Sequence, residues 1–249
     1  MIENSVFISG SISIKILPQE IKDSIQKIIE NKMEILVGDA NGIDSLVQDY
    51  CVSLNYFNVT VYSISLAPRY QASDKFSLKN VSVPSHVVGG RERQQEKDKA
   101  MTNDSQYSFV IWDGKSKGSY ANAIRALEQD KKIKLYAESR FLKPSEINSE
   151  SIERIYRNNS GYTAFEVVEY LKNRIDSVFH RTQDLNRYLV QNLIIKKDNN
   201  VYQPMSSYED LFIIERYRGR VKGIKFRNEF LGWIEGNLKS DRVVQGGLF

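Results

Sequence analysis

The chain of 249 residues is long enough for one large domain or two modest ones, and its 41% hydrophobic and 27% charged content is typical of a globular protein. No apolar stretch approaches the roughly 20 residues of a membrane helix. The single cysteine excludes an internal disulfide, and with only two histidines beside it a metal site is disfavoured. The net charge of +4 permits a phosphate-bearing ligand without demanding nucleic acid. The first ten residues lack the basic start of a secretory signal, so the sequence predicts a cytoplasmic protein with no membrane contact.

The first half of the chain alternates between two kinds of pattern. Short runs rich in β-branched and aromatic residues are typical of buried parallel strands. These runs are SVFISG, MEILVGD, VTVYSIS, YSFVIWDG and KIKLYAE. Helical spacing follows at about residues 19–29, 43–54, 91–102 and 119–127, whereas residues 67–88 have no clear period and predict a long loop. Repeated strand and helix predict right-handed βαβ units, so we expect an α/β fold with a doubly wound, parallel, Rossmann-like sheet.

The pattern changes near residue 140, where a polar segment with a proline predicts a linker. We therefore expect two domains, residues 1–140 and 141–249. In the second, residues 163–175 and 182–192 have helical spacing, and residues 193–204 indicate a β-hairpin. This order is similar to a winged helix, so the second domain is expected to be smaller, mostly helical and winged-helix-like.

Three glycine-containing segments follow predicted strands at the edge where open parallel sheets bind ligands. They read ISGSIS, VGDANGID and WDGKSKGS, and each places free backbone N–H groups near a helix start, which suits an anion. The candidate ligand-binding residues within them are Ser9, Gly10, Ser11, Gly38, Asp39, Gly42, Asp44, Asp113, Gly114, Ser116, Gly118 and Ser119. Arg91 joins them because it follows two glycines at the start of a helix. Each loop taken alone also fits an ordinary connection, and neither a P-loop nor a G-x-G-x-x-G motif is present.

The segments VFISGS, LVGDANGID, KDKAM, YSFVIWDGKSKGS and KKIKLY resemble the SLOG superfamily of Rossmann-like domains over about residues 4–138. This superfamily includes the cytokinin-activating phosphoribohydrolases, the DNA-processing protein A family and ligand-sensing domains of bacterial antiphage systems. The resemblance implies that the three loops bind a nucleotide-derived ligand that is ADP-ribose-, cyclic ADP-ribose- or NAD-like, and it suggests a sensor in antiphage defence. Some members hydrolyse an N-glycosidic bond and others only bind.

The chain departs from the hydrolase members at two places. Those enzymes share a PGGxGTxxE segment, but the matching segment here, DGKSKGSYANA, has Tyr120, Ala121 and Asn122 where acids would be expected and contains no glutamate. They also share an arginine four residues before a methionine, a position that Lys97 occupies here as a candidate ligand contact. Because an amide does not take a proton at neutral pH, these differences favour binding over hydrolysis.

Hydrolysis would need another carboxylate. Asp98, Asp104 and Asp113 are the available acids, and Asp113 is the candidate catalytic residue because it follows a strand directly into the crevice. Asp98 and Lys97 are equally consistent with the solvent-facing side of a helix. Whether the protein is an enzyme therefore stays open, with hydrolysis of a nucleoside monophosphate or NAD-like substrate as the enzyme alternative.

The densest positive charge lies in the second predicted domain. Its candidate nucleic-acid-binding residues are Arg216, Arg218, Arg220 and Lys222, which interleave with Tyr217. The helix at residues 182–192 balances Arg187 with Asp184, which is weak for a helix that reads a DNA groove. A protein partner or self-association through this domain fits equally well, and binding of single-stranded DNA is the third open alternative.

Overall fold

The computed structural model describes residues 4–175 and 179–246. It divides the chain into two compact units, Met1–Glu153 and Arg154–Phe249. The predicted boundary at residue 140 falls inside the first unit, where residues 140 and 141 pair with the neighbouring strand and Leu142 is buried.

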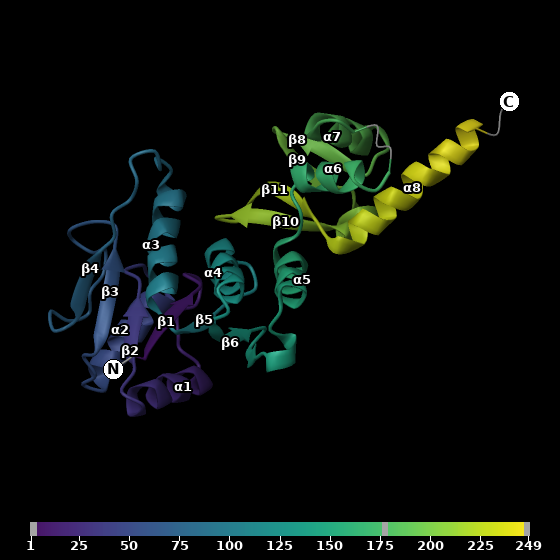
Figure 1. Cartoon of the computed structure of the whole chain (residues 1–249). Helices are drawn as coiled ribbons and strands as arrows, with labels where there is room; N and C mark the ends of the chain where they lie inside the picture. Colours follow the sequence, from purple (N-terminus) through teal and green to yellow (C-terminus); the bar gives the residue numbers. More distant parts are fainter. Residues whose placement is uncertain (1–3, 176–178, 247–249) are drawn as a thin grey trace. The chain divides into compact units, whose positions relative to one another are not determined.

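A seven-stranded sheet with the order β4-β3-β2-β1-β5-β6-β7 forms the centre of the first unit (Figure 1). All neighbouring strands are parallel except β6 and β7, which are antiparallel. The strands are β1 (Ser5–Gly10), β2 (Glu34–Val37), β3 (Val59–Ser63), β4 (Ser77–Asn80), β5 (Tyr107–Ile111), β6 (Lys132–Ala137) and β7 (Arg140–Phe141).

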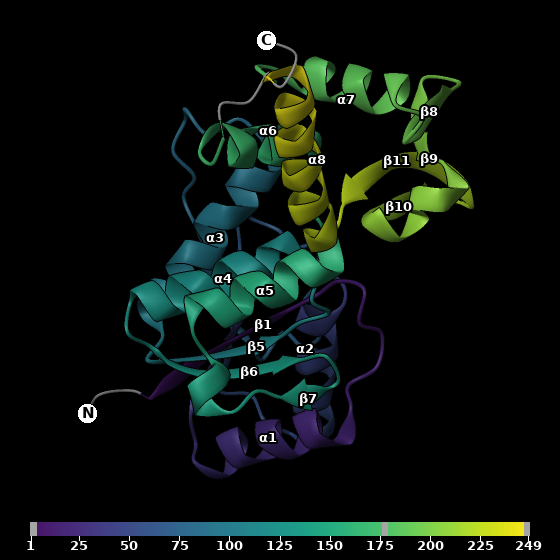
Figure 2. The same ribbon diagram turned by 90° about the vertical axis from the view of Figure 1, so that its right-hand side faces the viewer.

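Helices cover both faces of this sheet (Figure 2), and they are α1 (Gln19–Glu30), α2 (Ile43–Ser53), α3 (Gly90–Asp104) and α4 (Lys117–Glu128). Alternating residues of β1 divide between the two faces: Val6 and Ile8 pack in the cluster that contains α1 and α2, whereas Phe7 packs with Met101 of α3. The predicted Rossmann-like α/β fold is therefore confirmed. Because β1 is flanked by β2 and β5, and the helices that follow β1 and β5 lie on opposite faces, the sheet has its topological switch point here.

The prediction of a long loop over residues 67–88 is wrong in part. Ser77–Asn80 forms the edge strand β4, which pairs in parallel with β3. All four residues of β4 are exposed, so the strand is held by backbone hydrogen bonds and has no apolar alternation for a sequence pattern to reveal.

The second unit combines helices with two separate hairpins. Its elements are α6 (Ala164–Lys172), α7 (Thr182–Gln191), the hairpin β8 (Ile195–Asp198) and β9 (Val201–Pro204), the 3₁₀ helix η2 (Ser206–Leu211), the hairpin β10 (Phe212–Tyr217) and β11 (Arg220–Phe226), and α8 (Asn228–Gly246). Before them come the 3₁₀ helix η1 (Pro144–Glu146) and α5 (Ser149–Ser160). The two predicted helices and the first hairpin are confirmed, whereas β10 and β11 were not predicted, and the winged-helix assignment stays a prediction. No helix in the described part of the chain is long and apolar enough to cross a membrane.

Candidate functional site

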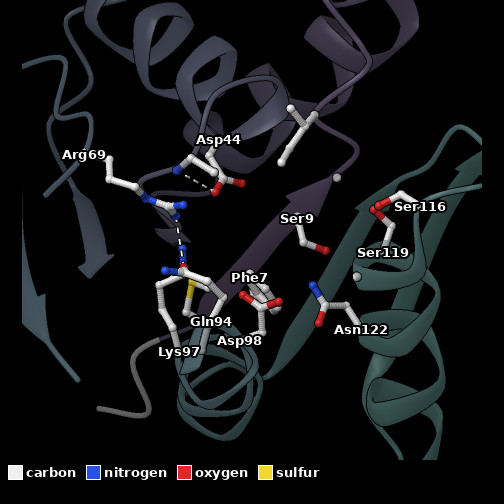
Figure 3. A pocket seen from close by; sticks show the side chains of 15 residues that line it. Phe7, Ser9, Asp44, Arg69, Gln94, Lys97, Asp98, Ser116, Ser119 and Asn122 are labelled. Carbon is white, nitrogen blue, oxygen red and sulfur yellow. Dashed lines mark hydrogen bonds between the residues drawn. The ribbon is translucent and has the colours of Figure 1, made fainter. Parts of the chain in front are cut away.

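A pocket with a volume of about 150 Å³ lies beyond the carboxyl end of β1, at the switch point of the sheet (Figure 3). Its walls come from β1, the start of α2, one side of α3 and the first turns of α4. Sites for small molecules in proteins are usually about 300–1,000 Å³. The pocket is therefore large enough for part of a ligand, such as a sugar phosphate, and a nucleotide would extend out of it.

Ser116, the last residue before α4, and the first turns of α4 form one wall of the pocket. Ser119 and Asn122 are buried, and Ser119 shares a hydrogen bond of 3.3 Å with the hydroxyl of Ser11 in the loop after β1. The indole Nε1 of Trp112 donates to the carbonyl of Ser116 at 3.0 Å, which holds the N-terminus of α4 against the sheet. Trp112 is thus part of the core, in agreement with the ordinary role of an aromatic residue at the end of a strand.

Asp113 is engaged within its own loop and does not line the pocket. Its Oδ1 accepts from the backbone N–H groups of Lys115 at 2.9 Å and Ser116 at 2.7 Å, and its Oδ2 accepts from the Ser13 hydroxyl at 2.6 Å. Burial raises the pKa of Asp113, but these hydrogen bonds outweigh it and hold the pKa below its usual range. The carboxylate therefore serves as an ionised cap for the turn.

A buried ion-pair network closes the opposite side of the pocket. The Asp39 carboxylate, only 2% exposed, accepts from Lys97 Nζ at 2.8 Å and from Arg69 Nη2 at 2.6 Å, and also from the Ser63 hydroxyl at 2.9 Å. Burial opposes ionisation, but the hydrogen bonds and charges of Arg69 and Lys97 dominate, so the pKa of Asp39 lies well below its usual range. The alternative of a solvent-facing Lys97 is wrong, because its side chain is 3% exposed and its charge is matched by Asp39.

Two further carboxylates, Asp44 and Asp98, line the pocket, and both have a pKa above the usual value of an aspartate. Burial, reinforced by the charge of Asp98 and opposed by that of Lys97, raises the pKa of Asp44 to about 6. Burial likewise raises the pKa of Asp98, against the opposing charge of Lys97. The Asp44 carboxylate fits beside Gly38 only because a glycine has no side chain, since a Cβ at that position would lie 2.2 Å from the Asp44 Oδ2. Acids with perturbed pKa values in a crevice are typical of functional sites.

The hydroxyl of Ser9 is the feature of the pocket that points most directly to a ligand. The Ser9 side chain lies toward the centre of the pocket, opposite Asn122 (Figure 3). The hydroxyl is buried, with the residue 3% exposed, and it has no hydrogen-bond partner within the structure. Because an unsatisfied buried polar group costs about 1–3 kcal/mol, this hydroxyl indicates a place for a polar group of a ligand.

The structure brings together part of the predicted site. The predicted residues that line the pocket are Ser9, Gly10, Asp44, Lys97, Ser116, Gly118 and Ser119. Those that lie in the supporting loops instead are Ser11, Gly38, Asp39, Gly42, Asp113 and Gly114. Arg91 is exposed at the start of α3 and does not line the pocket.

Sequence reasoning missed several pocket residues as ligand contacts. They are Phe7, Ile12, Ala40, Arg69, Gln94, Asp98, Met101 and Asn122. One signal was available for α3, because Gln94, Lys97, Asp98 and Met101 follow the i, i+3, i+4, i+7 spacing of a single helix face. No comparable pattern marks Arg69, which reaches Asp39 from an irregular segment.

In the second unit, the predicted basic residues gather on the β10–β11 hairpin. Arg216, Arg218, Arg220 and Lys222 are all exposed. Arg218 and Gly219 form the turn with φ of 48° and 78°, which is typical of a tight two-residue hairpin turn. Tyr217 is 58% exposed, and the charged groups of Arg218 and Lys222 lie 5.3 and 5.8 Å from its ring centre.

No group of three or more histidine, cysteine or carboxylate side chains suited to a metal ion occurs within residues 4–175 and 179–246.

Comparison with known proteins found no match: no family model fits the chain, and no curated protein or solved structure is significantly similar to it.

Proposed function

We propose that the first unit is a SLOG-like domain that binds a nucleotide-derived ligand, of the ADP-ribose, cyclic ADP-ribose or NAD type, in the β1 pocket. The observation that carries this proposal is the buried, unpartnered hydroxyl of Ser9 at the switch point of the sheet. A ribose hydroxyl or a phosphate oxygen would accept from it, and the rest of the ligand would lie outside the pocket.

The surroundings of Ser9 support a ribose phosphate. Ser116 and Gly118 line the pocket at the N-terminus of α4, where free backbone N–H groups and the helix dipole favour an anion. Lys97 and Arg69 share the single negative charge of Asp39 and together leave one positive charge in excess, while Asn122 offers an amide that pairs with a hydroxyl. A sensor that transmits this binding to a protein partner of the second unit, as in antiphage defence, is the physiological role that we propose.

A pair of serine substitutions tests the proposal. Ser9 and Ser108 are both strand residues with a buried hydroxyl that has no partner among the described residues, but Ser9 lines the β1 pocket whereas Ser108 lines a separate cavity on the other face of the sheet. We expect Ser9→Ala to weaken the binding of ADP-ribose, NAD or AMP, measured by calorimetry, by about tenfold, because one hydrogen bond to a charged or polar ligand group is lost. Ser108→Ala should bind ADP-ribose, which has no phosphate monoester, as the unchanged protein does. If none of these ligands or the cyclic ADP-ribose isomers binds, the proposal is wrong.

Hydrolysis of an N-glycosidic bond is a second candidate, and the carboxylates of Asp44 and Asp98 favour it. An acid with a pKa near 6 is suited to donate a proton to a leaving base at neutral pH. If the protein is a hydrolase, incubation with AMP or NAD will release free base, and Asp44→Asn will abolish this release while Asp113→Asn preserves it. Binding without release of base would exclude the enzyme alternative.

For the second unit we propose contact with single-stranded nucleic acid through the tip of the β10–β11 hairpin. Cations around an exposed aromatic ring suit a phosphate backbone with stacked bases. Arg218→Gln with Arg220→Gln should weaken oligonucleotide binding and make the slope of log affinity against log salt concentration shallower by about 1.4. Lys196→Gln with Lys197→Gln, on the other hairpin of the unit, removes the same charge and serves as the control. Equal losses in both pairs would indicate non-specific attraction.

A further inference from the structure

A second and larger cavity lies on the other face of the sheet, between α1 and the first residues of β5 and β6. Its volume of about 470 Å³ falls within the usual range for small-molecule sites. The two cavities share no lining residue. This cavity opens near the amino ends of the strands, whereas the β1 pocket lies beyond the carboxyl end of β1.

The charged residues of this cavity are all cations. Lys27 of α1 and Lys132 and Lys134 of β6 line it, and it contains no aspartate or glutamate. In the described part of the chain, none of the three forms an ion pair. Lys134 instead donates to the neutral Ser24 hydroxyl at 2.8 Å. Burial, together with the charge of Lys27, lowers the pKa of Lys134, so these two ammonium groups repel each other in the structure.

The rest of the lining combines neutral polar side chains with apolar and aromatic ones, and the polar ones are Asn4, Ser24, Asn31 and Ser108. Tyr107 and Phe109 of β5 form part of it, and Ile28 and Met33 contribute aliphatic surface. The ammonium groups of Lys132 and Lys134 lie 5.6 and 5.7 Å from the ring centres of Tyr107 and Phe109 respectively. Lys134 lies closer still, at 4.4 Å, to the ring centre of Phe141, which is outside the cavity lining. These cation–π contacts hold the two ammonium groups without supplying a negative charge.

We propose that this cavity binds a phosphorylated small molecule with an apolar or aromatic body. A doubly charged phosphate monoester matches the cluster of lysines and removes their repulsion, since phosphate is the anion that several ammonium groups bind together. The body of the ligand lies against Phe109 and Ile28. This binding site is separate from the β1 pocket and does not depend on the function proposed for it.

Naphthyl phosphate is a suitable probe, and naphthol is its matched control without the anion. We expect calorimetry of the full chain to show one saturable site for naphthyl phosphate and much weaker binding of naphthol. Lys134→Met should weaken the phosphate probe at least tenfold, because a charge-assisted contact is lost while the aliphatic stem remains. Lys27→Met should act in the same direction, and thermal melting checks that both variants fold.

Two controls separate this site from general attraction and from the β1 pocket. Lys22→Met removes the same charge from α1 outside the cavity and should leave probe binding unchanged, as should Ser9→Ala. Saturation with the probe should also protect Lys27 and Lys134 from acetylation, read by mass spectrometry. The proposal is overturned if the phosphate probe does not bind, if naphthol binds equally well, or if Lys22→Met or Ser9→Ala weakens the probe as much as Lys134→Met.

Discussion

Asp39 shows how a single buried carboxylate positions one side of the β1 pocket. It accepts hydrogen bonds from Lys97 and Arg69, both of which line the pocket, and it is itself shielded from the ligand. Removing one partner of a buried pair leaves the other charge uncompensated. We expect Asp39→Asn to lower the free energy of unfolding, measured with denaturant, by about 3 kcal/mol.

A surface pair on the same helix provides the control for Asp39→Asn. Glu96 of α3 accepts from Lys99 at 2.6 Å, and the lysine side chain of this pair is half exposed. Because exposed pairs contribute little, Glu96→Gln should change the free energy of unfolding by less than about 1 kcal/mol. A similar loss in both variants would show that Asp39 is no more important to the fold than a surface charge.

Asp44 predicts a pH dependence of ligand binding. The pKa of about 6 in the folded protein lies above the usual 3.8 of an aspartate, so the carboxyl group is protonated below pH 6 and gains a negative charge as the pH rises through that value. The new charge repels an anionic ligand, and Asp98, whose pKa is also raised, acts in the same direction. We expect the affinity for ADP-ribose to fall on the order of tenfold between pH 5 and pH 7.

ADP-ribose is the ligand of choice for this measurement, because its diphosphate diester has no proton that titrates near pH 6, unlike a phosphate monoester. Asp44→Asn removes the titrating group, keeps an oxygen to accept from the Ala40 N–H, and should flatten most of the profile. A profile that is as steep in Asp44→Asn as in the unchanged protein would assign the pH dependence to another group.

At the scale of elements, Gly10 at the end of β1 and Gly118 in the first turn of α4 have different roles. A Cβ on Gly10 would lie 2.4 Å from the carbonyl oxygen of Ile111, so β1 and β5 approach each other only because the residue is glycine. A Cβ on Gly118 would meet no atom closer than 4.0 Å, the hydroxyl of Ser116. Gly10 therefore serves the fold, whereas Gly118 borders open space in the pocket.

Alanine at these two positions separates fold from ligand binding. Gly118→Ala lies in a helix, where alanine is favoured by up to about 1 kcal/mol, so the protein should melt at the same or a higher temperature while ligand affinity falls. Gly10→Ala should lower the melting temperature because the backbone of Ile111 must move. Unchanged affinity in a stable Gly118→Ala variant would place the ligand away from the start of α4.

For the whole molecule, the division after Glu153 predicts that the first unit folds alone. The sheet, its four helices and the β1 pocket all lie within residues 1–153. A fragment of these residues should therefore unfold in one cooperative transition and bind ADP-ribose with the affinity of the full chain. Circular dichroism and calorimetry measure both properties. A fragment that stays unfolded, or that folds without binding, would show that the second unit is needed to complete the first.

The sequence by itself determined the order of elements in the first unit and the edge of the sheet at which its polar loops meet. Apolar runs alternating with amphipathic segments leave few arrangements other than a doubly wound sheet, and local patterns report such elements reliably. The exposed strand β4 escaped because it has no apolar alternation. The hairpin of β10 and β11 was interpreted only through its positive charge, although its Phe212 and Phe226 pack in the core of the second unit.

Only the tertiary structure decided the role of each polar residue at that edge. Asp39, Asp44 and Asp113 all follow strands beside glycines, yet one is an ion-paired support, one is a pocket acid with a raised pKa and one is a turn cap. The difference arises from partners far along the chain, such as Lys97, which lies 58 residues from Asp39. The pKa of an aspartate depends on its burial and on the charges near it in space, and the local sequence around the residue does not encode either.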